Sequence, residues 1–221
     1  MVAQDVTQRT SRRVYEVLRQ WIITGALRPG EVINEAAIME KLKVGRTPLR
    51  EATLLLIEEG LVRTFPRRGT FVSDITVDSL QHALEMRPRL EAIALEICCD
   101  KANDNELQHL ANLVNDYEVV SSVDSHEFDF NVHSLIVRLA HNDYLYDAWI
   151  RVYTACSRLK YSSLSPIQDA QTMLTELREV VCHLQHRDVH AAKEAMEVHL
   201  RSFILGLGPI AASKEWLSGM K

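Results

Sequence analysis

The sequence has few of the residues that mark secreted, membrane-spanning or disordered proteins. Only 4 of its 221 residues are Cys, 8 are Gly and 6 are Pro, which excludes a disulfide scaffold and a low-complexity chain. No apolar run is long enough to span a bilayer, and the N-terminus has no signal-like pattern. Because 47% of the residues are hydrophobic, the chain can build two modest cores. We expect a soluble, cytoplasmic protein.

The four cysteines do not have the spacing of a metal site. Cys98 and Cys99 are adjacent and therefore point to different sides of a helix, while Cys156 and Cys182 stand alone. The pattern favours buried free thiols in a reducing compartment.

Charge is divided unevenly along the chain. The net charge of −5 argues against nucleic-acid binding if the chain is taken as a whole. Residues 1–75, however, contain 12 Lys or Arg and 9 Asp or Glu, while the remainder contains 13 and 21. A basic first part joined to an acidic second part is typical of a DNA-binding domain fused to a domain with another task.

Residues 34–60 have the pattern of two helices joined by a tight turn. Asn34 can cap the first helix, and Lys43-Val44-Gly45 makes the turn. Thr47 can cap the second helix, with Pro48 in its first turn, where the missing N–H costs nothing. Apolar or small residues then recur at helical spacing: Leu49, Ala52, Thr53, Leu56 and Ile57.

Cations stand at the two places where this pattern would meet DNA. Arg46 and Arg50 begin the second helix on its polar side, and Arg matches the guanine edge in the major groove. Residues 61–65 and 70–72 alternate like strands, and Pro66-Arg67-Arg68-Gly69 closes them with a basic tip suited to phosphates. A solvated face or a plain turn explains either feature alone. Their conjunction favours a winged helix-turn-helix that binds double-stranded DNA.

Over residues 10–74 the chain resembles the GntR family of bacterial transcription regulators. A single difference is Gly45, where the family usually has Ser, so that one phosphate contact is lost. The matching residues are Leu18, Ile22, Gly25, Leu27, Pro29-Gly30, Asn34-Glu35, Leu42, Val44, Arg46-Thr47-Pro48, Arg50-Glu51-Ala52, Glu59-Gly60-Leu61-Val62 and Arg68-Gly69.

The resemblance implies a homodimer that sets two winged heads on a short palindromic operator with a GT...AC type core. The bundle described next would supply much of the dimer contact. The residues expected at the DNA are Arg46 and Arg50 for the bases, Thr47 and Gly69 for the backbone, and Arg67 and Arg68 for the wing.

From Thr76 onward the apolar periodicity is helical only. Six helices with short links predict an antiparallel bundle whose interior can hold a ligand. Asp104, Asp124, Asn142 and Asp188 are the expected caps, and Pro88 predicts a kink near Arg87. The expected ranges are 78–102, 104–120, 124–140, 142–162, 166–186 and 188–206.

The expected fold is therefore mostly α, a winged helix-turn-helix followed by a six-helix bundle. We assign residues 1–75 to the DNA-binding domain, 76–209 to an effector-binding and dimerisation domain, and 210–221 to a tail. Residues 1–9 have the composition of a loose polar arm, with the first helix capped by Thr10 or Ser11.

Three residues of the second half have the chemistry of a metal site. Asp129 and His133 are four apart, so a helix presents both on one face, and His199 lies on the last helix. Residues 78–201 resemble the FCD effector domain, which implies the FadR subgroup of GntR regulators. The matches are Glu85, Arg87, Leu90-Glu91, Asp129, His133, Asn142, Glu176, Met196 and His199-Leu200.

In many such domains one Asp and three His hold a divalent ion such as Zn, Ni or Mn. The resemblance puts Asp129, His133 and His199 at three of the four positions and Leu177 at the fourth. Three interpretations stay open: an ion with three protein ligands completed by water or the effector, an effector hydrogen-bonded directly after loss of the ion, or a buried polar network. Arg87 can bind a carboxylate effector or pair with Glu91.

The sequence thus predicts a DNA-binding transcription regulator, by default a repressor, whose operator affinity a small organic acid controls. A metal-sensing regulator is disfavoured because Leu177 removes a ligand. The alternative is a metal-dependent hydrolase with Asp129, His133 and His199 around a catalytic ion, fused to a DNA-binding head. No nucleophile motif or evident general base accompanies these three residues, so we expect a protein that is not an enzyme.

Overall fold

The computed structural model describes the backbone of residues 2–118, 122–162 and 170–205, and the side chains of residues 9–118, 125–158 and 170–205. The described chain forms two compact units. The first takes in the chain up to Leu80 together with Thr154–Ser162, and the second takes in the remaining described residues. None of the described helices is both long enough and apolar enough to cross a membrane.

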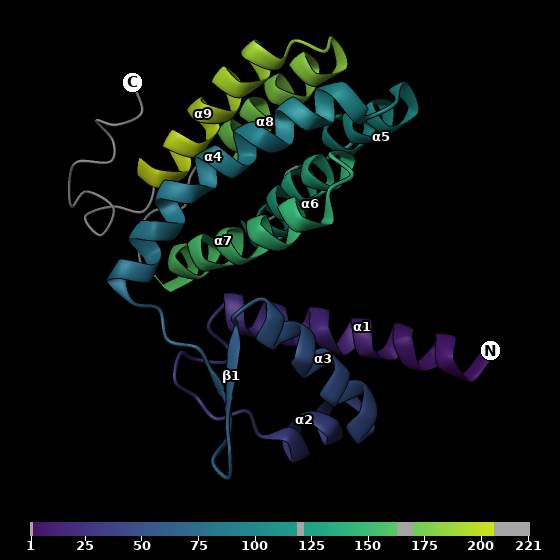
Figure 1. Cartoon of the computed structure of the whole chain (residues 1–221), viewed down its shortest axis with the longest axis vertical. Helices are drawn as coiled ribbons and strands as arrows, with labels where there is room; N and C mark the ends of the chain where they lie inside the picture. The colour runs from purple at the N-terminus through teal and green to yellow at the C-terminus, as the bar shows by residue number, and fades with distance from the viewer. Residues whose placement is uncertain (1, 119–121, 163–169, 206–221) are drawn as a thin grey trace. The chain divides into compact units, whose positions relative to one another are not determined.

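The first unit contains the predicted winged helix-turn-helix (Figure 1). The turn between its second and third helices is closed by Lys43 in a left-handed conformation, with the Val44 N–H bonded to the Met39 carbonyl. Asn34 caps the second helix as predicted, since its side chain accepts the Ala37 N–H at 3.1 Å. The elements are α1 (Val2–Ile23), α2 (Glu35–Leu42), α3 (Arg46–Glu58), β1 (Val62–Phe65) and β2 (Gly69–Val72).

Two predictions about the helix starts in this unit are wrong. Helix α1 begins at Val2, not at Thr10 or Ser11, because residues 2–9 contain no Gly or Pro that would stop the helix. Helix α3 is capped by Gly45 and begins at Arg46, so Thr47 lies inside its first turn. Position 45 is thus where a Ser side chain would cap the helix, and Gly45 makes no such bond.

The ribbon has the predicted antiparallel pairing, with Val62 opposite Val72 and Phe65 opposite Gly69. Gly69 therefore belongs to the second strand, and the turn is shorter than predicted. The cross-strand pair Thr64 and Thr70 joins its hydroxyls at 3.0 Å. An additional bridge from Val32 to Phe71 attaches the ribbon to the segment before α2.

The core of the first unit lies between α1, α3 and the base of the ribbon. Its largest fully buried side chains are Leu18, Ile22, Leu49, Leu56 and Leu61. Polar contacts also join α1 to α3: Ser11 hydrogen-bonds Glu51, Tyr15 hydrogen-bonds Glu59, and Arg19 pairs with Glu59 at 3.2 Å. The acidic residues Glu51 and Glu59 therefore serve the packing of the unit.

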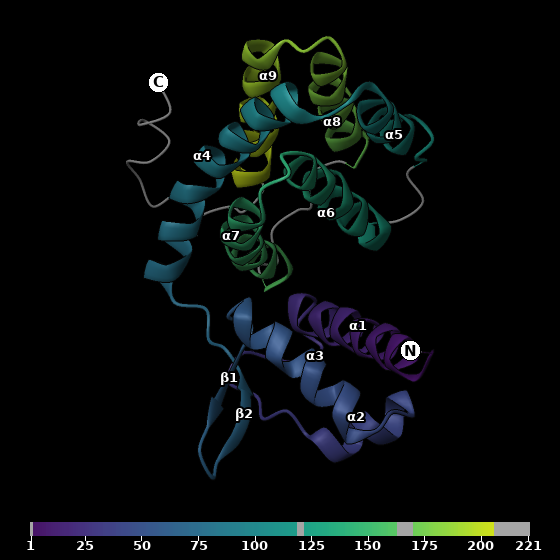
Figure 2. The same cartoon turned by 45° about the vertical axis from the view of Figure 1, so that its right-hand side comes forward.

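The bundle consists of the six predicted helices, and their termini correct several expected positions (Figures 1 and 2). Asn142 and Asp188 cap helices as predicted. Asn103, not Asp104, caps the second bundle helix through a capping box with Glu106. The helices are α4 (Val77–Lys101), α5 (Asp104–Asn115), α6 (Ser122–Leu139), α7 (Asp143–Ser162), α8 (Ala170–Gln185) and α9 (Val189–Leu205).

The third bundle helix begins at Ser122, before Asp124, and the second ends at Asn115, well before residue 120. Pro88 lies inside α4, and the kink near Arg87 stays a prediction. The predicted start of the fifth helix at Pro166 and the tail at residues 210–221 lie outside the described residues.

The bundle has one continuous apolar core, beside which a group of polar and charged side chains is also buried. Helices α8 and α9 pack along each other and are drawn side by side in Figures 1 and 2. Trp149, Leu95, Ile136, Leu174 and Leu177 are among its fully buried side chains. Three of the cysteines are buried free thiols as predicted, but Cys182 is exposed on α8, which corrects the expectation for that residue.

Candidate DNA-binding surface and metal centre

The first turn of α3 presents the predicted base-reading residues to solvent. Arg46, Thr47 and Arg50 are exposed, while Leu49 and Ala52 on the opposite face are buried. The side chains of Arg46 and Arg50 make no ion pair with any residue that the structure describes. The helix buries its other side in the core, so both cations lie on the exposed side of its N-terminal turn. In a recognition helix the N-terminal residues are the ones that contact base edges in the major groove.

The ribbon carries the second predicted set at its tip. Arg67, Arg68 and Gly69 are all exposed. Arg67 has a φ of 62°, a left-handed conformation that a non-glycine residue rarely adopts. The Arg68 N–H bonds the Phe65 carbonyl at 3.1 Å, and the Phe65 and Phe71 rings meet edge to face below the turn. The tip is thereby fixed by backbone and apolar contacts, which leaves both cations available for phosphates.

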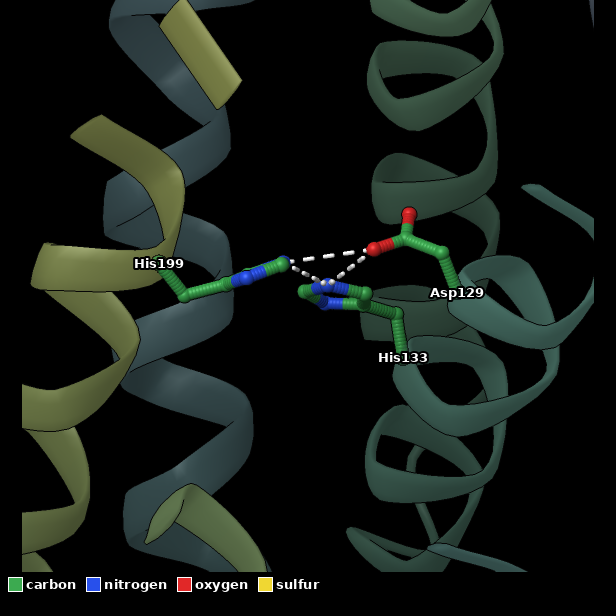
Figure 3. Close-up of side chains that lie close together, drawn as sticks. All are labelled: Asp129, His133 and His199. Carbon is green, nitrogen blue, oxygen red and sulfur yellow. Dashed lines mark hydrogen bonds and ion pairs between the residues drawn. The ribbon is translucent and has the colours of Figure 1, made fainter. Parts of the chain in front are cut away.

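In the second unit, Asp129, His133 and His199 come together as the sequence predicts (Figure 3). Asp129 and His133 share one face of α6, and His199 reaches them from α9. The Nε2 atoms of the two histidines are 3.1 Å apart. Asp129 Oδ1 lies 3.2 Å from His199 Nε2 and 3.7 Å from His133 Nε2. All three residues are at least 95% buried.

Two further carboxylates contact the histidines on the opposite side of each ring. Glu176 Oε2 accepts a hydrogen bond from His199 Nδ1 at 3.0 Å. Glu91 Oε1 lies 3.0 Å from His133 Nδ1 and also accepts the Trp149 indole N–H at 2.8 Å. Each histidine therefore lies between a glutamate on Nδ1 and Asp129 on Nε2.

Arg87 is buried beside this cluster. Its Nε lies 3.5 Å from Glu91 Oε1, so the predicted pairing with Glu91 is present. Its guanidinium also lies 4.7 Å from the centre of the Tyr153 ring and 4.6 Å from that of Phe203. Tyr153 connects back to the triplet, because its hydroxyl donates to Asp129 Oδ2 at 2.7 Å.

The electrostatics of the site favour positive charge at His133. Burial by itself would lower the pKa of His133, but the Glu91 and Asp129 carboxylates outweigh it and raise that pKa to about 9. Burial would likewise raise the pKa of Asp129, but His133 and His199 hold it well below its usual range. The site thus stabilises either a proton or a metal cation between Asp129 and the two imidazoles.

The geometry of the triplet fits a first-row divalent ion. Neighbouring ligand atoms about 2.0–2.1 Å from one ion lie roughly 3.0–3.4 Å from each other. Two of the three separations, 3.1 and 3.2 Å, fall in this range, and the third, 3.7 Å, exceeds it by a few tenths of an ångström. Two imidazoles and one carboxylate are also a common donor set for Zn, Ni or Mn. Asp129, His133 and His199 would hold the ion.

Leu177 is fully buried on α8 and cannot ligate a metal. Its neighbour Glu176 contacts the site instead, through His199. The sequence did not assign Glu176, Trp149 or Tyr153 to the site. Trp149 and Tyr153 are four apart on α7 and so share a face, but such aromatic pairs usually line a core without any polar role.

Comparisons with known proteins agree with this arrangement. Residues 10–72 match the model of the bacterial regulatory proteins of the gntR family, and residues 82–202 match that of the FCD domain. The HTH-type transcriptional repressor RspR of Escherichia coli is 24% identical over 217 residues, which cover 96% of this chain and 95% of RspR. An uncharacterized HTH-type transcriptional regulator in an unstable DNA locus of Streptomyces ambofaciens is 31% identical over 204 residues, covering 88% and 84%.

Among solved structures, E. coli McbR/YncC superimposes with a TM-score of 0.72 at 18% identity, covering 90% of this chain and 96% of that one. At such identity the likeness concerns the fold. The FCD match alone covers more than half of the chain, and the Streptomyces relative extends over most of it. The chain therefore belongs to the GntR family of bacterial transcriptional regulators and carries an FCD domain.

Proposed function

We propose that the protein is a dimeric repressor that binds a short palindromic operator and releases it when a small organic acid binds in the bundle. The acid would bind at a divalent ion held by Asp129, His133 and His199. The observation that carries the effector part is the convergence of these three donors in a buried site surrounded by further carboxylates.

The DNA-binding part is supported by the exposed cations of the first unit. Arg46 and Arg50 would read base edges from α3, and Thr47 would contact the backbone. Arg67 and Arg68 would neutralise phosphates from the wing, where Gly69 allows close approach of the chain. In this division of roles α3 gives sequence preference and the wing gives general affinity.

The charges around the triplet support an ion over direct effector binding. Asp129 and Glu91 are both fully buried carboxylates with lowered pKa values, and Asp129 faces both histidines. An organic anion that entered next to Asp129 without a cation would be repelled and desolvated. A divalent ion removes this obstacle, since it can bind Asp129 and the effector's carboxylate at the same time.

Because Leu177 cannot act as a ligand, the proposed ion has an open coordination position. With three protein ligands, the ion keeps positions for water or an effector oxygen, which is the arrangement of exchangeable sites. Arg87 remains a predicted contact for the effector, because a guanidinium binds a carboxylate bidentately. Operator release would follow if the effector prefers a conformation in which the two heads no longer match the half-sites.

The decisive experiment is a metal analysis of the purified chain beside a Leu177→His variant. We expect the wild type to carry about one divalent ion per chain, held more weakly than in the variant, which regains a fourth ligand. Operator binding is then titrated with small mono- and dicarboxylic acids before and after chelation. The expected result is acid-induced release that disappears with the ion. An exposed leucine on α3, changed in Leu54→His, is the matched control and should leave metal content unchanged.

Three results would contradict the proposal in different places. A wild type without metal, combined with a metal-loaded Leu177→His variant, would mean that this chain has kept the geometry of the site but lost the ion. Acid-induced release that persists after complete chelation would assign effector binding to Arg87 and hydrogen bonds alone. A chain that fails to bind any palindromic operator would remove the repressor function itself.

A further inference from the structure

Both histidines of the triplet meet a carboxylate through the ring nitrogen that faces away from Asp129. His199 Nδ1 donates to Glu176 Oε2 at 3.0 Å, and His133 Nδ1 lies 3.0 Å from Glu91 Oε1. The two glutamates come from different helices, Glu91 from α4 and Glu176 from α8. Neither is one of the three residues that converge on the ion site. Glu176 is hydrogen-bonded to its histidine, whereas Glu91 lies at a similar distance from His133 Nδ1 without an aligned hydrogen bond.

The group next to each ring nitrogen determines which nitrogen carries the proton. An ionised carboxylate has only acceptor atoms, so the imidazole nitrogen next to it must carry the hydrogen. A ring that binds a cation is neutral: it keeps this one N–H, and its other nitrogen offers the lone pair. In both rings that other nitrogen is Nε2, the atom next to Asp129 Oδ1.

We propose that Glu91 and Glu176 are positioning residues, which hold His133 and His199 in the tautomer and orientation that turn both Nε2 lone pairs toward one cation. This inference rests on the ion of the proposed function and adds the residues that prepare its ligands. Carboxylates that accept the second N–H of a metal-bound histidine fix the ring and make the ligand more basic.

Both carboxylate oxygens of Glu176 are hydrogen-bonded. Its second oxygen, Oε1, accepts the Ser202 hydroxyl at 2.6 Å, while Oε2 accepts from His199. Ser202 and His199 are three residues apart on α9, so they lie on one face of that helix. Both carboxylate oxygens are thus tied to the helix that supplies the ligand. Helix α8 contributes this positioning carboxylate directly before Leu177, the position at which the family resemblance implies a fourth ligand.

Glu91 has a second role, which makes it the weaker test. Its Oε1 accepts from Trp149 at 2.8 Å and lies 3.5 Å from Arg87, so it also compensates a buried guanidinium. Removal of the Glu91 charge would disturb Arg87 as well as His133. Glu176 hydrogen-bonds two residues of one helix, His199 and Ser202 on α9, and one of them is the metal ligand itself. The experiment therefore begins with Glu176.

The tautomer of His199 can be read in the metal-free protein, whereas His133, whose pKa is raised to about 9, keeps both protons at the pH used. The full chain is labelled with ¹⁵N-histidine, and long-range ¹H–¹⁵N spectra are recorded at about pH 8, above the ordinary pKa of imidazole. A His199→Asn variant assigns the signals. We expect the His199 proton on Nδ1 in the wild type and its partial transfer to Nε2 in Glu176→Gln, because an amide can donate as well as accept. Glu179→Gln, exposed on the same helix, is the control and should change nothing.

The same variants are titrated with Co²⁺, whose absorption bands report ligand geometry. Glu176→Gln should bind Co²⁺ about 10–100-fold more weakly with altered bands, and Glu176→Asp, which keeps the carboxylate, should recover part of the loss. Glu91→Gln should weaken binding in the same direction. Should Glu176→Gln not fold, Ser202→Ala releases one oxygen of Glu176 and should give a smaller shift of the same sign.

The outcomes separate this inference from the proposed ion. A His199 ring that carries its proton on Nε2 in the wild type, or keeps its spectrum in Glu176→Gln, overturns the positioning role whatever the metal result. A wild type that binds no Co²⁺ contradicts the proposed ion, and the tautomer spectra then decide the role of Glu176 alone. Glu176→Gln with unchanged Co²⁺ affinity and bands would make Glu176 a packing residue.

Discussion

The two units of this chain use charged residues in opposite ways. In the first unit the functional candidates are exposed: Arg46 and Arg50 on α3 and Arg67 at the wing tip have no ion-pair partner among the described residues. In the second unit the candidates are buried. His133, for example, has carboxylate oxygens of both Glu91 and Asp129 within 4 Å of its ring nitrogens. The first set is accessible to a large partner, and the second is enclosed by the helices of the bundle.

This difference predicts how each set responds to substitution. An exposed cation contributes little to folding, so its removal should change DNA binding and leave stability alone. A buried carboxylate shares its partners with its neighbours, and its removal affects every group that it compensates. The first unit should therefore tolerate changes at its site better than the second.

Asp129→Asn should give the largest effect on ligand binding. Loss of a residue that hydrogen-bonds a metal ligand costs about 10–100-fold in metal affinity, and loss of a direct ligand should exceed that. We expect isothermal titration to detect no tight binding of Zn²⁺ and the operator to remain bound at all effector concentrations. Asp147→Asn, exposed on α7, is the control. If folded Asp129→Asn no longer bound the operator without effector, the two units would not divide the work as we describe.

Arg50→Ala tests the exposed site. We expect a loss of about 1–3 kcal/mol on the cognate operator with relaxed base preference at one position, because a bidentate contact to a base edge is lost. The melting temperature should stay unchanged. Binding is measured by fluorescence anisotropy on the cognate operator, on operators changed at single positions and on random DNA. An equal loss on cognate and random DNA would assign Arg50 to the backbone.

The organisation of the first unit was predictable because its signals are local. The turn at residues 43–45, the cap Asn34 and the basic ribbon tip lie within one short stretch, and each depends on its neighbours in sequence. The errors occurred at helix starts. Thr47 was the expected cap of α3, but Gly45 occupies the cap position. The turn after Lys43 leaves the backbone of Gly45 extended, with ψ at 178°, so the helix begins at the next residue.

The bundle site was predictable only in part. Asp129 and His133 share a helix, so their spacing indicated a common face, and the family resemblance added His199. Glu91, Trp149, Tyr153 and Glu176 reach the same centre from α4, α7 and α8. No spacing in the sequence connects residues that meet only through helix packing. For Glu91 the local signal was its spacing of four residues from Arg87, which predicted their pairing.

Helix caps allow the stability of the two units to be compared directly. Asn34→Ala removes the side-chain acceptor for the Ala37 N–H and should cost the first unit about 1 kcal/mol. Asn103→Ala breaks the capping box of α5 and should cost the bundle a similar amount. Hydrogen–deuterium exchange by mass spectrometry should show each change confined to its own unit. Faster exchange throughout the chain in either variant would mean that the two units unfold together.

Arg67→Ala should produce the smallest change, and it separates the two cationic sets within the first unit. We expect weaker binding to all DNA sequences alike and a salt slope reduced by about one ion, because a phosphate contact carries no base information. Arg67 has a left-handed backbone, so Arg67→Gly is the matched variant that removes the charge and relaxes the strain. Equal losses in both variants would assign the effect to charge. A changed base preference in either would mean that the wing also reads sequence, and the contrast between α3 and the wing would then fail.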